Sequence, residues 1–325
     1  GSASPSSPCR VISCSGCRAK RRVAISCSAP PSCRCPRCGC GSPRAGCAAD
    51  AAPVVLWQIG QPDRNDAEFA LAPAAHREFR NDGFFVVGES DPKRDWPYAH
   101  PGPSDSWAGS RPHTFVVCFG LKTIPADGEC QLKLDVVDTH RDGPPQLRIS
   151  VNGQNFERTL AAGAGDDSIN GQPGKGRPQN WTLPFPSRLL RAGDNDIRLT
   201  TLGGSWLLYD ALTLTTPAGA ELGRVTAHTL VDRLDAVRAL QTVGGRALQP
   251  VRVTLRHFGP EAKGTVKVAG AEPLTVPLRA GLQEVTALVP AVSAPTPCAV
   301  SVEVDGQSAT ARTVNERLHF LRMQG

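Results

Sequence analysis

The chain has little of what membrane-spanning and long-helical proteins need. Its 325 residues contain a single Met and no run of about 18 apolar residues, so no segment is predicted to cross a membrane. Only 5% of the residues are aromatic, and long helical periodicities are scarce. Gly (32) and Pro (29) are abundant instead, which is typical of short strands joined by tight turns. We therefore predict an all-β protein without a membrane span.

Acidic residues are absent from positions 1 to 47, which hold eight Lys or Arg. The net charge of +6 is therefore located in this segment, and the rest of the chain is close to neutral. A nucleic-acid-binding protein needs a basic folded surface with aromatic or helical readers. We therefore predict no nucleic-acid partner.

The first 53 residues are predicted to be a disordered tail. Ser, Pro, Ala, Arg and Cys dominate them, so they offer too little apolar surface to offset the entropy of ordering. They also lack the apolar middle region of a signal peptide. Cys14, Cys17, Cys35 and Cys38 have the spacing of a four-cysteine zinc site. The alternative is an accidental match, because five further cysteines lie in the same segment.

From residue 54 to 217 the sequence predicts a first β-sandwich. In Gln131–Val136 apolar and polar residues alternate, which buries one face of a strand and leaves the other in water. Val151-Asn152-Gly153 has the composition of a tight hairpin turn. The predicted strands are Val54–Ile59, Phe84–Val87, Thr114–Phe119, Gln131–Val137, Gln146–Val151, Trp181–Leu183, Asp196–Thr201 and Trp206–Thr215.

Residues 218 to 313 predict a second, immunoglobulin-like or fibronectin-like sandwich, followed by a C-terminal tail at 314–325. A strand recurs about every ten residues from Val251 to Thr313, as in such folds. Residues 221 to 243 stay ambiguous, because Leu230, Leu234, Val237 and Leu240 also fit a helical spacing.

A family resemblance rests on several segments of the first block. Leu56-Trp57-Gln58-Ile59-Gly60-Gln61-Pro62-Asp63-Arg64, followed by Glu68-Phe69, resembles the opening strand of the third, carbohydrate-binding-like domain of rhamnogalacturonan lyases, polysaccharide lyase family 4. Later landmarks of that domain are matched by Phe85–Gly88, Asp95–Tyr98, Leu190–Asn195 and Leu208–Leu212. The resemblance implies a galactose-binding-like jelly roll. It implies no lyase activity, since the catalytic machinery of that family lies in a separate domain.

The aromatic-rich loop 92–113 is the candidate sugar-binding region. Sugar rings present apolar faces ringed by hydroxyls, so a site needs an accessible aromatic ring beside polar groups. The alternative is that Trp96 and Trp107 plug the end of the sandwich. The candidate carbohydrate-binding residues are Asp95, Trp96, Tyr98, Trp107, Arg111 and Trp206.

No catalytic, metal or cofactor site is predicted. The sequence lacks a Gly-x-Ser-x-Gly elbow, a His-Glu-x-x-His motif and a phosphate loop. Asp166–Gly171 offers the oxygen ligands that Ca²⁺ prefers but no EF-hand pattern, which favours a solvated turn. His140, between Asp138 and Asp142, is interpreted as part of a hairpin turn. Cys118 and Cys130 are either a disulfide pair or buried thiols.

The leading functional hypothesis is a non-catalytic polysaccharide-binding or accessory module of a bacterial glycan-degrading system, extracellular, periplasmic or at the cell surface. One alternative is a fragment of a rhamnogalacturonan lyase-like or glycoside hydrolase enzyme whose catalytic domain lies outside this chain. A second is a structural interaction protein. The sequence predicts neither the sugar nor the oligomeric state.

Overall fold

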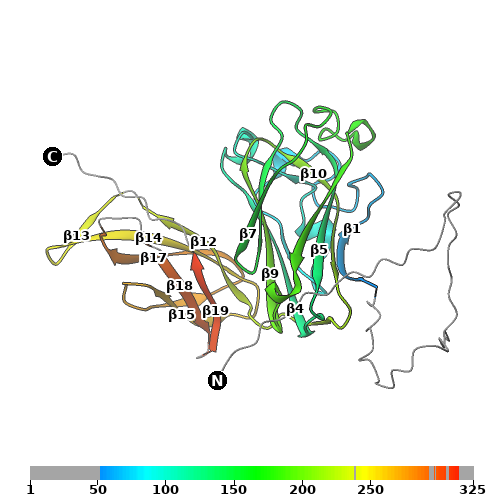
Figure 1. Cartoon of the computed structure of the whole chain (residues 1–325). Coiled ribbons are helices and arrows are strands. Elements are labelled where there is room, and N and C mark those ends of the chain that lie inside the picture. Colours follow the sequence, from blue (N-terminus) through cyan, green and yellow to red (C-terminus); the bar gives the residue numbers. More distant parts are fainter. Residues whose placement is uncertain (1–51, 238, 293–295, 297, 305–306, 315–325) are drawn as a thin grey trace, which may run out of the picture. The chain divides into compact units, whose positions relative to one another are not determined.

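The computed structural model describes residues 52–237, 239–292, 296, 298–304 and 307–314 (Figure 1). The predicted disordered tail and the cysteines Cys14, Cys17, Cys35 and Cys38 lie outside the described residues, as does nearly all of the predicted C-terminal tail. Among the described residues no helix is both long enough and apolar enough to span a bilayer.

The first domain is a sandwich of two mostly antiparallel sheets. One sheet has the order β1-β10-β5-β8, with β3 beside β10, and the other has the order β11-β4-β9-β6-β7, with β2 parallel to β4. The strands of the first sheet are β1 (Val54–Gly60), β3 (Ala99–His100), β5 (Glu129–Thr139), β8 (Gln179–Pro186) and β10 (Leu207–Thr216). Those of the second are β2 (Phe84–Val86), β4 (Thr114–Thr123), β6 (Gln146–Val151), β7 (Gln154–Thr159), β9 (Gly193–Gly203) and β11 (Glu221–Gly223). The predicted all-β, jelly-roll sandwich is confirmed.

Aromatic rings fill the core between these two sheets. The Trp96 ring packs edge-on against Phe115 and Tyr209, with centroid distances of 5.1 and 5.2 Å. His100 stacks on Phe115 at 3.9 Å and donates from Nε2 to the His113 carbonyl, so its Nδ1 accepts from the Tyr209 hydroxyl. Burial lowers the pKa of His100 to about 3, so the ring is neutral and fully hydrogen-bonded.

Two predicted turns have different outcomes. β6 and β7 form the expected hairpin, with Asn152 at φ 48° and Gly153 at φ 92°, the positive values that such a turn requires. The interpretation of His140 and its neighbours, Val137–Gly143, as a hairpin turn is wrong, because β5 and β6 belong to different sheets. This segment crosses from one sheet to the other at the end of the sandwich.

The second domain also consists of two antiparallel sheets around its own core. One sheet contains β12 (Thr229–Ala236), β13 (Gln241–Val243), β14 (Arg246–His257) and β17 (Gly281–Pro290), and the other contains β15 (Ala262–Val268), β16 (Leu274–Leu278), β18 (Cys298–Val304) and β19 (Gln307–Val314). The ambiguous segment 221–243 contains β11, β12 and β13, and its described residues include no helix. Leu230 and Leu234 are buried as members of β12, paired to β14, and not as one face of a helix.

The cysteines of the first domain lie in different sheets. Cys130 on β5 faces the core between the sheets, whereas Cys118 on β4 packs with Val86 and Val116 in a separate cluster. No bond joins Cys118 to Cys130, so the predicted disulfide alternative is wrong. The buried-thiol alternative describes Cys130, and burial raises the pKa of its thiol to about 11.

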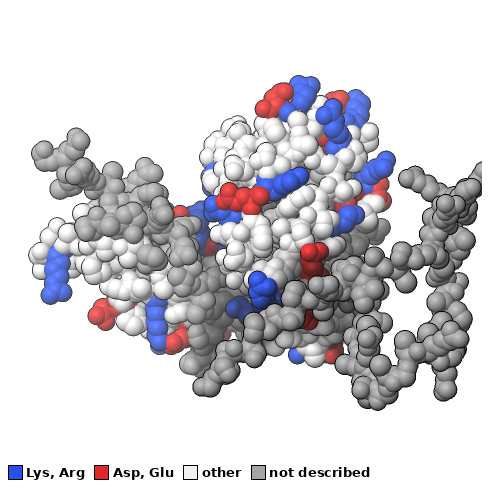
Figure 2. Space-filling view, viewed as in Figure 1, with Lys and Arg blue, Asp and Glu red and all other residues white. Residues whose placement is uncertain are grey.

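Charges on the visible face of the molecule are mixed. Figure 2 shows Lys and Arg side chains interspersed with Asp and Glu, with no broad area of one sign on the described surface in this view. Several are exposed pairs, such as Arg148 with Glu157. Such pairs each contribute little to stability, so the fold depends on its two cores.

Asp66 is an exception to the usual placement of carboxylates at the surface. Its side chain is fully buried, and neither carboxylate oxygen has a hydrogen-bond partner among the described residues. Burial raises the pKa of Asp66 from 3.8 to about 6, because the charged form loses its hydration.

Asp66→Asn should flatten the pH dependence of stability between about pH 4 and pH 6. The folded pKa lies above the unfolded one, so the folded state binds more protons and the free energy of unfolding falls as pH rises through this window. The shift corresponds to at most about 3 kcal/mol at neutral pH. We expect the variant to gain about 1–2 kcal/mol at pH 7 in urea denaturation and nothing at pH 4. An equal effect at both pH values would contradict this assignment.

Candidate functional site

The described part of the first domain has a pocket of about 440 Å³ at the end where the long loops gather. These loops lie at the upper end of the blue-to-green domain in Figure 1. Five chain segments build the pocket, at positions 76–77, 104–107, 140–143, 166–170 and 205–206. Its lining residues are His76, Arg77, Ser104, Asp105, Trp107, His140, Asp142, Gly143, Asp166, Ile169, Asn170, Ser205 and Trp206.

Two indoles provide the apolar part of this rim pocket. Trp107, on a short 3-10 helix at Ser106–Ala108, is partly exposed, and its ring meets those of His76 and Phe79 edge-on at 5.1 and 6.0 Å. Trp206 is only 3% exposed and lies edge-on to His140 at 5.6 Å. Trp107 therefore offers an accessible ring held in place by its neighbours, while Trp206 forms part of the wall.

Asp105 joins two of the loops that form the pocket. Its carboxylate accepts hydrogen bonds from the Gly102 amide at 2.7 Å and from the Ser205 hydroxyl. Burial raises the pKa of Asp105, and these hydrogen bonds oppose that shift. Ser205 also donates its amide to the Gly143 carbonyl at 2.9 Å, so the contact extends to the crossover after β5.

The His140 ring presents a hydrogen-bond donor near Asp166 in the rim pocket. The Gly143 amide donates to His140 Nδ1 at 3.0 Å, so the neutral ring carries its proton on Nε2. Nε2 lies 4.0 Å from an oxygen of Asp166, whose side chain is 71% exposed. Donor and acceptor thus stand side by side, an arrangement that suits a ligand bearing hydroxyl groups.

The loop 161–178 owes its position to the buried carboxylate of Asp138. Three groups of this loop donate to it: the Ala164 amide at 2.9 Å, the Ser168 hydroxyl at 2.6 Å and the Arg177 amide at 3.1 Å. These three hydrogen bonds offset the cost of burying the Asp138 carboxylate. The same loop carries Asp166 and Asn170 to the pocket.

Two of the residues predicted to bind sugar are core residues. Trp96 and Tyr98 are both 0% exposed, so neither has surface to offer a ligand, and this part of the prediction is corrected. Trp96 plugs the sandwich end, as the alternative interpretation held. Tyr98 acts behind the pocket wall, where its hydroxyl donates to the Ile169 carbonyl at 2.6 Å.

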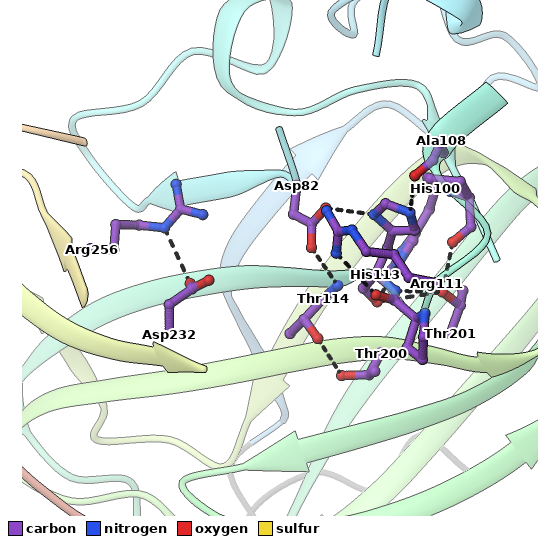
Figure 3. Close-up of polar contacts among 12 residues, drawn as sticks. Asp82, His100, Ala108, Arg111, His113, Thr114, Thr200, Thr201, Asp232 and Arg256 are labelled. Atoms are coloured by element: carbon purple, nitrogen blue, oxygen red, sulfur yellow. Dashed lines mark hydrogen bonds and ion pairs between the residues drawn. The ribbon is translucent and has the colours of Figure 1, made fainter. Parts of the chain in front are cut away.

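Asp95 and Arg111 are placed away from the rim pocket. Asp95 ends the short helix α1 (Pro92–Asp95), where Arg94 donates to it at 2.7 and 2.8 Å. Arg111 pairs with Asp82 at 3.2 Å, in the network drawn in Figure 3. Of the six predicted residues, the structure brings Trp107 and Trp206 together in the pocket. Whether these two bind a sugar stays a prediction.

The Asp82 network fixes the approach to β4 (Figure 3). Asp82 binds His113 Nδ1 at 2.6 Å and accepts from the Thr114 amide at 2.9 Å. Burial alone would raise the pKa of Asp82, but the hydrogen bond and charge of His113, the Thr114 amide and Arg111 outweigh it and lower the pKa to about 2. Arg111 and His113 therefore hold the loop rather than face a ligand.

Within the described ranges no three His, Cys, Asp or Glu side chains are grouped as a metal site would require. In the calcium-like loop Asp166–Gly171, the carboxylate of Asp167 pairs with Lys175 at 3.1 Å, and Ser168 is turned toward Asp138. The oxygen ligands of this loop therefore do not converge on one point.

The sequence-based prediction of sugar-binding residues contained none of the nine polar residues that line the pocket: His76, Arg77, Ser104, Asp105, His140, Asp142, Asp166, Asn170 and Ser205. They come from five segments far apart in the chain, so no local spacing relates them. The signal that was present was the length of loops 61–83, 89–112 and 161–180, since long loops on a compact sandwich often carry function.

Asp138→Ala should release the loop 161–178. Three donors lose their acceptor, and we expect the free energy of unfolding to fall by about 2–4 kcal/mol. Hydrogen exchange of peptides covering 161–178 should accelerate. Asp142→Ala is the matched control, because Asp142 is 73% exposed and forms an ion pair with exposed Arg141. Equal exchange rates in the two variants would rule out the anchoring role of Asp138.

The comparisons with known proteins place the first domain in a family. Residues 55–214 match the family model described as CBM-like, polysaccharide lyase family 4, domain III. No curated protein matches the chain. Among solved structures, the chain is similar to a family 35 carbohydrate-binding module from an environmental isolate, at 14% identity and a TM-score of 0.25, covering 35% of this chain and 72% of that one.

Two glycoside hydrolases are also similar. One is the GH2 β-galacturonidase from Eisenbergiella tayi, at 8% identity and a TM-score of 0.21, covering 60% of this chain and 34% of that one. The other is the exo-chitosanase from Amycolatopsis orientalis, at 15% identity and a TM-score of 0.25, covering 63% and 25%. The chain thus spans about a third or less of these enzymes, and such values establish no shared activity. The family assignment rests on the family model alone. The model confirms the resemblance inferred from Leu56–Arg64 and the later segments. Residues 55–214 of this chain belong to the CBM-like family, polysaccharide lyase family 4, domain III.

Proposed function

We propose that this protein is a non-catalytic module that binds a polysaccharide through the rim pocket of its first domain. The family of that domain supports a carbohydrate-binding accessory role. The observation that carries the proposal is the partly exposed Trp107 ring, which lies beside hydrogen-bond donors and acceptors of the pocket lining. A sugar ring would stack its apolar face on the indole, and its hydroxyls would reach the polar groups around it.

The pocket suits one or two sugar units rather than a long chain. Its volume of about 440 Å³ lies at the lower end of the range usual for small-ligand sites. Trp206 and Ile169 close the wall of the pocket, and both are buried. With a single accessible ring and solvent-exposed polar groups, we expect affinities per site of about micromolar to millimolar.

The proposal is tested by affinity electrophoresis of the full chain in gels that contain galactan, rhamnogalacturonan, pectin, xyloglucan or mannan. Retarded migration in at least one gel, together with a change in Trp fluorescence on titration, is the expected result. Unchanged mobility and fluorescence with every polysaccharide would refute the proposal.

Trp107→Ala should weaken binding to the retarding polysaccharide at least about ten-fold, because the stacking surface is lost. Trp107→Phe keeps an aromatic face and should retain part of the affinity. Trp181→Ala is the matched control, since Trp181 is a partly exposed indole under Arg158, outside the pocket. Affinity is measured by electrophoresis at several polysaccharide concentrations, with the melting temperature as a check on folding. Equal losses of affinity in the Trp107 and Trp181 variants would show that the polysaccharide does not bind at the rim pocket.

A further inference from the structure

The charges around the rim pocket bear on the class of sugar that it accepts. Three carboxylates line it, those of Asp105, Asp142 and Asp166, and Arg77 is the one Arg or Lys among the lining residues. Burial lowers the pKa of His76, and the charge of Arg77 adds to this effect, so His76 is neutral at pH 7. The lining therefore carries more negative than positive charge.

The carboxylates differ in how far they are already satisfied. Asp142 is paired with Arg141, at 3.3 and 3.4 Å, and Asp105 accepts from Gly102 and Ser205. Asp166 has the His140 ring 4.0 Å away and is otherwise open to solvent. An ionised carboxylate only accepts hydrogen bonds, so a ligand group beside Asp166 must be a donor, either a hydroxyl or an ammonium.

We propose that the rim pocket selects a neutral or amino sugar and discriminates against uronic acids. A uronate carboxylate would bring a further negative charge and no donor to a lining that already has an excess of acceptors. Hydroxyl and ammonium groups share the donor chemistry that Asp166 requires. This inference rests on the proposed function and names the ligand class of the same site.

Arg77 is the feature that works against this selection. A guanidinium binds a carboxylate in a two-pronged geometry, so Arg77 alone would favour a uronate. Arg77 is an exposed residue of the short 3-10 helix His76–Glu78, whereas Asp105 is 5% exposed and lines the pocket. Asp142 and Asp166 are also exposed, so solvent screens their charges and that of Arg77 alike. These two carboxylates outnumber the one guanidinium, and Asp105 adds a third carboxylate to the lining.

The test compares the binding of charged and uncharged sugar probes. Homogalacturonan oligosaccharides are prepared fully methyl-esterified and then de-esterified, and both are titrated into the full chain at low ionic strength, beside galactan and glucosamine oligosaccharides. The best neutral or amino probe should bind at least about five-fold more tightly than de-esterified galacturonan. Tighter binding of the glucosamine probe than of galactan would identify an amino sugar, and the reverse a neutral one.

Variants of the lining carboxylates test whether these residues cause the discrimination against de-esterified galacturonan. The double variant Asp142→Asn/Asp166→Asn should narrow the difference between neutral and de-esterified probes to about two-fold or less. Asp167→Asn is the matched control, because Asp167 lies in the same loop, pairs with Lys175 and does not line the pocket. Arg77→Gln should widen the difference.

The outcomes separate this inference from the proposed function. De-esterified galacturonan binding as tightly as the best neutral or amino probe would overturn the inference and leave the binding function standing. The same holds if the double variant keeps the full discrimination. Failure of every probe and every polysaccharide to bind would overturn both.

Discussion

The rim pocket depends on the need to satisfy two buried carboxylates. Asp138 and Asp105 lie in the interior, where an unpaired charge is costly, and each accepts hydrogen bonds from surrounding groups. The donors come from loops: three groups of loop 161–178 bind Asp138, and Gly102 and Ser205 bind Asp105. These hydrogen bonds give long segments without regular strands a defined conformation, and the shape of the pocket follows from them.

The fold could be predicted from the sequence because the period of two along each strand is a local property. β6 was expected at Gln146–Val151 and lies there, and the turn Asn152-Gly153 has the backbone angles that its residues favour. Which sheet a strand joins is a non-local property. Val137–Gly143 has the composition of a hairpin turn, yet it connects strands of different sheets, since the pairing of β5 with β8 and β10 comes from distant residues.

The candidate site was predictable in part only. The aromatic loop 92–113 does reach the pocket. Its sequence alone does not determine which of its aromatic rings are buried in the core and which are exposed. Trp96 and Tyr98 point into the core, and Trp107 stands at the rim. The polar members could not be found, because His76, Asp105 and His140 become neighbours only when loops from both sheets meet.

The loop 92–113 therefore contributes residues both to the core and to the rim pocket. Trp96 packs against Phe115 and Tyr209, and through Tyr98 the same loop holds the Ile169 carbonyl at the pocket wall. A change in any of these buried rings alters stability and pocket shape together. The family assignment describes the sandwich, and half of the residues in its landmark segments are buried. The chemistry of the ligand must instead be argued from the exposed members of the lining, where Trp107 and Asp166 can change without loss of the core.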